Sequence, residues 1–148
     1  MGLIDNKLIK VAICVSKFNY EHVSNLEKST FSKLVESGIN KENIDVFYVP
    51  GALELPIILA ECCKAERYDG LIAVGAIIRG ETYHFEVVSD QSAFAIMNVQ
   101  LKYGIPIMNA VLTTNNDEET SNRTVIKGHE AAEGLLQTIA TLKKINQD

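Results

Sequence analysis

Four short segments hold most of the residues that could do chemistry, and each follows a run typical of a buried strand. Phe18 and Asn19 follow the first run, Glu54 lies in PGALELP after the second, His84 ends RGETYH after the third, and a Thr-Thr pair follows the fourth. Imidazole can accept and donate a proton near neutral pH. An aromatic ring beside an amide can stack on a flat heterocycle while the amide fixes its orientation. The combination predicts a small-molecule site, but it does not by itself identify a reaction.

Each of these residues also has a purely structural interpretation. A lone loop histidine such as His84 is more often structural than catalytic. Glu54, just before Pro56, can act as a favourable charge at a helix N-terminus, and Phe18 can cap the edge of the core. The glycines of GAIIRGETYH allow backbone N–H groups to approach a phosphate, but they also suit an ordinary turn. The segment lacks the GK[ST] ending of a Walker loop.

The stretch before the last predicted helix carries two cations, Arg123 and Lys127. Charged residues in a polar stretch are often simply solvated. Alternatively, a guanidinium and an ammonium group can hold a phosphate through charge-assisted hydrogen bonds. The residues alone leave both interpretations open.

Apolar runs alternate with segments of helical period, which predicts a parallel sheet covered on both faces. Strands are expected at residues 10–16, 44–49, 71–76 and 107–112, and helices at 20–37, 57–65, 87–103 and 129–145. Val87, Phe94, Met97 and Leu101 of the third helix are expected to face the sheet, whereas residues 115–128 predict at most a short irregular helix. Right-handed crossovers give a three-layer α/β/α sandwich with a four-stranded parallel sheet, flavodoxin-like in kind, as one domain over residues 1–148. Its four strand ends would bring the chemical segments to one rim.

Composition limits the partners and the compartment. The chain has 148 residues, 47% apolar and 22% charged, with a net charge of −5, which argues against disorder, nucleic-acid binding and an anionic membrane surface. No stretch reaches the roughly 18 apolar residues of a membrane span. Three cysteines in this pattern predict neither a disulfide framework nor a CxxC site, and no second histidine or cysteine stands at ligand spacing, so no metal is expected. These features favour a soluble cytoplasmic protein.

Five motifs in order connect these segments to a known family. They are FN after the first strand, VPGALELP after the second, GAIIRGETYHFEVV after the third, GIPIMNAVLTT around the fourth, and KGHEAA at the last helix. Together they closely resemble the lumazine synthase family, and PGA-x-E-x-P combined with RGET-x-H is specific. The resemblance implies condensation of 5-amino-6-(D-ribitylamino)uracil with 3,4-dihydroxy-2-butanone 4-phosphate, giving 6,7-dimethyl-8-ribityllumazine, phosphate and water in the penultimate step of riboflavin biosynthesis. It implies no metal or redox cofactor, and a homo-oligomer that is a pentamer or a multiple of pentamers.

The resemblance also implies roles for individual residues. Phe18 would stack on the pyrimidine, Glu54 would hydrogen-bond the ribityl chain, and His84 would move protons. The other residues implied to bind substrate are Asn19, Ala52, Leu53, Ile77, Ile78, Glu81, Thr82, Asn109, Arg123 and Lys127. The Glu81–Thr82 turn and Arg123 would hold phosphate, and in the family Arg123 and Lys127 come from the neighbouring subunit.

Three positions depart from the family pattern. Leu53 stands where many members have an aromatic residue, and Asn109 where many have Phe. The segment between Arg123 and Lys127 is shorter than the glycine-containing RAGTKAGNKG form that is common in the family. We therefore expect a less enclosed ring pocket and a different helix junction.

Two other function classes remain consistent with the rim segments. A flavodoxin-like binding module would use the same rim for a flavin or a phosphorylated effector without catalysis. A Schiff-base or aldol enzyme of similar fold would need a lysine to form the covalent imine. Neither PGALELP nor RGETYH contains a lysine, which argues against the second class.

Overall fold

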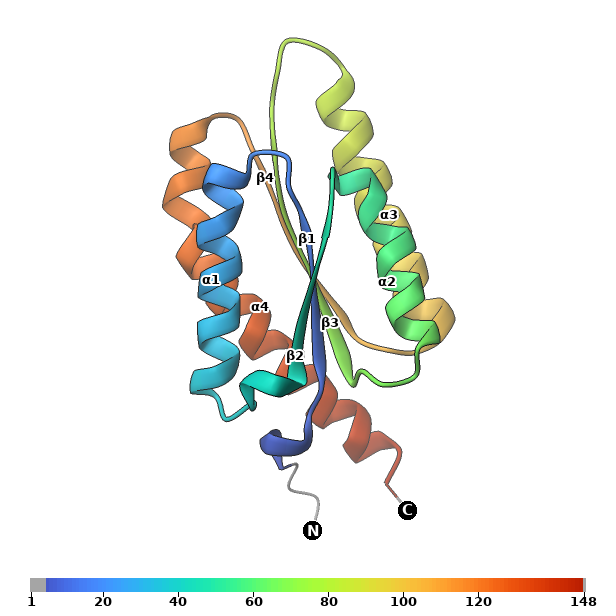
Figure 1. Ribbon diagram of the computed structural model, residues 1–148. Helices are drawn as coiled ribbons and strands as arrows, with labels where there is room; N and C mark the ends of the chain where they lie inside the picture. Colours follow the sequence, from blue (N-terminus) through green and yellow to red (C-terminus); the bar gives the residue numbers. More distant parts are fainter. Residues whose placement is uncertain (1–4, 148) are drawn as a thin grey trace.

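The computed structural model describes residues 5–147 and contains a four-stranded parallel sheet with helices on both faces (Figure 1). The strands β1 (Val11–Ser16), β2 (Ile44–Val49), β3 (Gly70–Ile78) and β4 (Ile107–Thr114) lie in the order β2-β1-β3-β4. Helices α1 (Tyr20–Glu36) and α4 (Asp117–Ile145) cover one face, and α2 (Leu55–Lys64) and α3 (His84–Tyr103) cover the other. The predicted α/β/α sandwich with a four-stranded parallel sheet is confirmed. Short 3₁₀ helices span Asn6–Leu8, Lys41–Asn43 and Ala52–Glu54.

The interior position of β1 in the sheet explains why its sequence is almost continuously apolar. All six of its residues are buried. Val11, Ile13 and Val15 join the core beneath α1 and α4, whereas Ala12 and Cys14 join the core beneath α2 and α3. Because successive side chains of a strand point to opposite faces, a strand covered on both faces needs apolar residues at every position.

Helix α1 follows its sequence pattern closely. Val23, Leu26, Thr30 and Leu34 are fully buried, at the spacing of one helical stripe, and Phe31 is partly buried against the same core. The helix ends before Gly38, whose φ of +104° lies in the left-handed region that favours glycine.

Helix α3 begins three residues earlier than expected and presents a different face to the sheet. Its first residue is His84, and its buried positions are Ser92 and Ile96, with Phe85, Val88 and Val99 partly buried. The expectation that four apolar residues face the sheet is wrong. They lie on the outer face with 39–73% of their surface exposed, namely Val87, Phe94, Met97 and Leu101. The helix is apolar on two sides, and periodicity alone does not say which side the chain itself covers.

Helix α4 corrects the expectation for the polar stretch after β4. One continuous helix runs from Asp117 to Ile145, so the residues expected to be irregular form its first half. The Asn116 side chain accepts a hydrogen bond from the Glu119 N–H at 2.9 Å, which caps the helix, and acidic residues fill the first turn. No glycine interrupts the short segment between Arg123 and Lys127, and the helix passes through it. Among residues 5–147, no helix has the length and apolar content that crossing a membrane requires.

Candidate active site

A cleft of about 370 Å³ opens at the carboxyl ends of β1 and β3, on the side covered by α2 and α3. Its volume lies within the usual range for small-molecule sites. It is lined by the ends of β1 and β3, the segments after β1, β2 and β3, and the start of α3. The lining residues are Ser16, Phe18, Asn19, Gly51, Ala52, Leu53, Glu54, Ala76, Ile77, Ile78, Gly80, Thr82, His84, Phe85 and Val88. The sequence expectation that these segments meet at one rim of the sheet holds for the first three.

The turn after β1 presents an aromatic ring and fixes an amide. Phe18 is 72% exposed, and its backbone N–H donates to the Pro50 carbonyl at 3.0 Å, which ties the turn to the end of β2. Asn19 adopts the left-handed conformation, with φ of 62°, and its Nδ2 donates to the Ala76 carbonyl at 2.9 Å. The exposed ring is thereby held beside the end of β3, in a position to stack on a planar ligand.

The segment after β2 folds into the 3₁₀ turn Ala52–Glu54. A Cβ at Gly51 would lie 3.0 Å from the Glu54 Oε1 atom, so the carboxylate bends back over Gly51 at the mouth of the cleft. Leu53 is 44% exposed, and Pro56 stands in the first turn of α2, where its missing N–H costs no helical hydrogen bond. Backbone groups and one carboxylate therefore face the same space.

His84 stands at the first position of α3 with its side chain exposed to the cleft. Its backbone N–H donates to the Thr82 hydroxyl at 3.3 Å. Arg79, which follows β3 five positions before His84, pairs with Glu86 in the first turn of the helix, and this pairing lowers the pKa of the Glu86 carboxyl. An imidazole in this position can exchange protons with a ligand lying over Phe18.

Four predicted site residues lie outside this cleft. Glu81 is exposed in the β3–α3 loop, and Asn109 is exposed on β4, where its Oδ1 accepts from the Val111 N–H at 2.9 Å. Arg123 and Lys127 lie one turn apart on α4 and line a separate recess of about 580 Å³ with Thr113 and Thr114. Within one chain, the two cations and the imidazole are therefore in different hollows.

Several cleft residues escaped the sequence analysis. Ser16 lies beside Gly75, and a Cβ built at Gly75 would lie 2.3 Å from the Ser16 hydroxyl oxygen. Phe85 and Val88 belong to the first turns of α3. The run HFEVV indicates them only when the predicted helix begins at His84 rather than at Val87. The buried end of β1 gave no comparable signal, because a serine there is compatible with any strand terminus.

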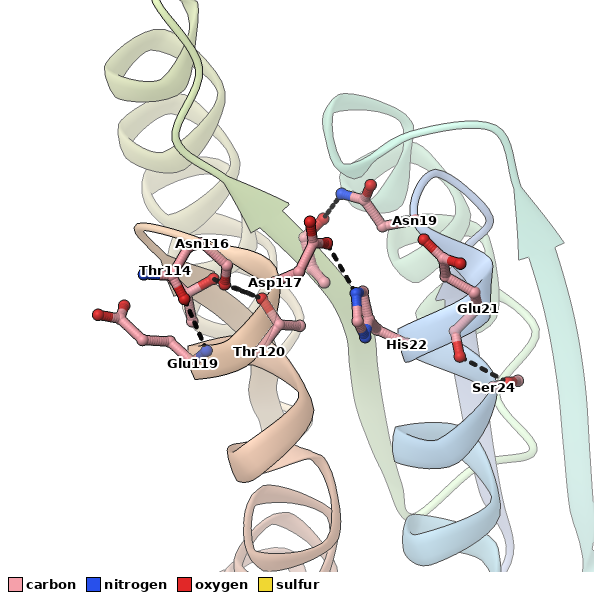
Figure 2. A network of polar contacts seen from close by, with 10 residues as sticks. Asn19, Glu21, His22, Ser24, Thr114, Asn116, Asp117, Glu119 and Thr120 are labelled. Atoms are coloured by element: carbon pink, nitrogen blue, oxygen red, sulfur yellow. Dashed lines mark hydrogen bonds and ion pairs between the residues drawn. The ribbon is translucent and has the colours of Figure 1, made fainter.

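One cluster away from the cleft has the donor set of a metal site. The side-chain ligand atoms of Glu21, His22 and Asp117 lie within 4.8 Å of one another, where the N-termini of α1 and α4 meet (Figure 2). His22 Nε2 is 2.8 Å from an Asp117 carboxylate oxygen. Both helices direct their positive dipole ends here, which favours carboxylates and opposes a bound cation. The contact is accounted for as a bridge between the two helices.

Comparison with known proteins decides the family. The model of the family described as 6,7-dimethyl-8-ribityllumazine synthase matches residues 8–143. A protein of that name from Methylobacillus flagellatus is 46% identical over 142 residues, covering 96% of this chain and 95% of the relative. One from Neisseria gonorrhoeae is 46% identical over 87% of this chain and 82% of the relative. One from Nitrosospira multiformis is 44% identical over 84% and 78%.

The chain belongs to the 6,7-dimethyl-8-ribityllumazine synthase family. The resemblance drawn from the five motifs is confirmed, and so is the expectation of a transferase of riboflavin biosynthesis. Membership in this family favours an enzyme over a binding module as the interpretation of the rim residues.

Proposed function

We propose that the cleft beside His84 condenses 5-amino-6-(D-ribitylamino)uracil with 3,4-dihydroxy-2-butanone 4-phosphate to give 6,7-dimethyl-8-ribityllumazine, phosphate and water. The observation that carries this proposal is the convergence of the motif residues after β1, β2 and β3 on one cleft of about 370 Å³. An exposed ring, a carboxylate and an imidazole face the same space. These are the groups that a planar, hydroxylated substrate and a series of proton transfers require.

Each group has a defined task in this reaction. Phe18 stacks on the pyrimidine, while Asn19 and the turn at Ala52 and Leu53 orient it, and Glu54 accepts hydrogen bonds from ribityl hydroxyls. His84 moves protons as the amine attacks the ketone, the imine forms, phosphate leaves and the second ring closes. Holding two small substrates in one orientation supplies a further large part of the rate.

Three of the remaining binding residues, Ile77, Ile78 and Thr82, line the cleft, whereas Glu81 and Asn109 lie outside it. Ile77 and Ile78 form the apolar wall at the end of β3, and the turn at Glu81 and Thr82 holds the phosphate. Asn109, exposed on β4, is the fifth member of this substrate-binding set. None of these tasks requires a metal or a redox cofactor.

The phosphate cations come from a second copy of the chain in this proposal. Arg123 and Lys127 face their own recess beside β4 and α4, not the cleft that holds His84. A head-to-tail ring places the unlike surfaces of successive copies against each other at every contact, so that one copy completes the site of the next. The complete site then contains His84 and the cations together.

The outer face of α3 supports such an assembly. Phe94, Met97 and Leu101 are 62%, 54% and 73% exposed and follow one stripe of the helix. A contiguous apolar stripe of this kind is typical of a protein–protein contact rather than of a solvated helix. We propose a pentamer or a multiple of pentamers, in which this stripe packs against neighbouring copies.

Two expectations, about the number of domains and about the cellular compartment, complete the proposal. Residues 1–148 act as one domain, in agreement with a family match that covers residues 8–143. The enzyme works in the cytoplasm, where its three buried cysteines persist as free thiols.

The test is a direct assay with both substrates. We expect the lumazine to form, followed by its fluorescence, with one phosphate released per product, and the heat-denatured protein serves as the control. A protein that binds a pyrimidine analogue in calorimetry but forms no product from the two substrates would instead be a binding module.

A further inference from the structure

The loop between β3 and α3 leads directly into His84 but has few contacts of its own residues that hold it in place. All four residues from Gly80 to Tyr83 are exposed, and a Cβ at Gly80 would meet nothing within 4 Å. Among residues 5–147, the side-chain hydrogen bond of this loop is the one from the His84 N–H to Thr82. The placement of His84 must therefore be set by contacts outside the loop.

Arg79, the residue directly after β3, supplies those contacts. Its backbone N–H donates to the Thr114 carbonyl at 2.9 Å, and its Nε donates to the Asn115 Oδ1 at 3.1 Å, which links it to the end of β4. Its Nη1 forms an ion pair with Glu86, and its guanidinium carbon lies 4.2 Å from the centre of the Phe85 ring. Phe85 and Glu86 directly follow His84 in the first turn of α3.

The geometry of these contacts fixes an orientation as well as a distance. An exposed ion pair alone contributes little, and the Arg79 and Glu86 side chains are 46% and 30% exposed. Here the same guanidinium also lies over the Phe85 ring and donates to Asn115. A lysine cannot do this, because its ammonium group has no plane and no fork of donors.

We propose that Arg79 is a positioning residue for the condensation, which holds the first turn of α3 so that the His84 imidazole faces the cleft. Phe85, one face of which Arg79 covers, itself lines the cleft, so the same contact also shapes the apolar wall. The inference rests on the proposed role of His84. It adds that this role depends on a residue that need not touch either substrate.

Kinetics of Arg79→Ala and Arg79→Lys provide the first test. We expect kcat to fall by about 10- to 100-fold in Arg79→Ala, the scale for small misplacements of a reacting group, with little change in KM. Arg79→Lys should recover only part of this loss, because it keeps the charge that pairs with Glu86 but not the stacking or the bond to Asn115. A loss confined to KM would overturn the proposal, since it would indicate a substrate-binding role.

The chain offers a matched control at Arg67. This arginine lies 3.9 Å from an Asp45 carboxylate oxygen, and its guanidinium carbon lies 5.2 Å from the Tyr68 ring centre. The contacts are of the same kinds, but none of the three residues lines the cleft. We expect Arg67→Ala to leave kcat unchanged. An equal fall in both alanine variants would reduce Arg79 to a general contribution to stability.

A double variant asks whether Arg79 acts through His84. If it does, His84→Ala/Arg79→Ala should be no slower than His84→Ala alone, because the group being positioned is already gone. A further fall of the same size as in the single Arg79 variant would overturn the proposal. If His84→Ala by itself keeps the wild-type rate, the proposed role of His84 fails, and the positioning role fails with it.

A measurement without substrates separates the two failures. In Arg79→Ala, amide hydrogen exchange of residues 85–88 should be faster than in wild type and in Arg67→Ala, because the first turn of α3 has lost its anchor. Unchanged exchange there, in a protein that still melts cooperatively, would contradict the proposal whatever the assay shows.

Discussion

Asn19 illustrates how much one residue type can predict about its own surroundings. Few residues other than glycine adopt the left-handed region readily, and asparagine is prominent among them. Here the side chain also donates to the Ala76 carbonyl at 2.9 Å, so that one residue turns the chain after β1 and ties β1 to β3. The sequence predicted an amide at the rim. It did not predict that this amide already has a backbone partner, because Ala76 lies 57 positions away.

At the same scale, His84→Ala tests the proton-transfer role. We expect kcat to fall by about 100-fold, the scale for a general acid or base, without loss of folding, because the side chain is exposed and contributes no core volume. His129→Ala is the matched control, since His129 lies on α4 in a groove away from the cleft. A wild-type rate in a folded His84→Ala protein would remove the imidazole from the mechanism.

Leu53 gives a prediction about the ring pocket. The side chain lines the cleft and is 44% exposed, which leaves room for a larger ring. If leucine replaces an enclosing aromatic, Leu53→Phe should tighten binding of a pyrimidine-ring analogue by about 0.5–1.5 kcal/mol, measured by calorimetry. Ile57→Phe, on the exposed side of α2, should leave affinity unchanged. Weaker binding by Leu53→Phe would mean that the pocket is packed around leucine.

Among the elements, α1 and α3 show what periodicity can and cannot predict. Both helices carry an apolar stripe, and both stripes were expected to face the sheet. In α1 the stripe is buried, but in α3 Phe94 and Leu101 lie on the outer face. An apolar stripe indicates that the helix face is buried, but the sequence does not show whether the chain's own sheet or another molecule buries it. The polar first half of α4 was missed for the opposite reason, because it has few apolar residues to set a period.

The contact between α1 and α4 gives a prediction about stability. A Cβ at Gly128 would lie 2.5 Å from the Ser29 hydroxyl oxygen and 2.8 Å from the Thr30 backbone nitrogen, which cannot move aside cheaply. Gly128→Ala should therefore lower the free energy of unfolding by about 1–3 kcal/mol. In Gly134→Ala the new Cβ meets the flexible end of Met108, and alanine favours the helix, so we expect little loss or a gain of up to about 1 kcal/mol.

Denaturant unfolding of the two glycine variants measures this difference. Equal free energies of unfolding for both would show that α1 and α4 can move apart without cost.

For the whole molecule, the exposed stripe on α3 gives a test of the proposed assembly. Phe94→Asp places a charge in the proposed contact, where it would have to be buried without a partner. Native mass spectrometry should then find smaller species than in wild type. Ile145→Asp is the matched control, because Ile145 is 71% exposed at the far end of α4, and it should leave the mass unchanged. An intact assembly in Phe94→Asp would exclude this stripe from the contact.

The proposed site, shared between the cleft of one copy and the recess of the next, leads to the most demanding test of the proposed assembly. His84 lines the cleft beside α3, whereas Arg123 lines the recess beside α4. In a head-to-tail ring, the His84 side of one copy meets the Arg123 side of the next. His84→Ala and Arg123→Ala proteins, each strongly impaired alone, should therefore regain activity when they are dissociated, mixed equally and reassembled. With random mixing, about a quarter of the contacts join two wild-type sides, so activity should return to about that fraction. Reassembled His84→Ala protein alone is the control. If mass measurement confirms mixed rings and activity does not return, the imidazole and the guanidinium do not meet across a contact, and the shared site is excluded.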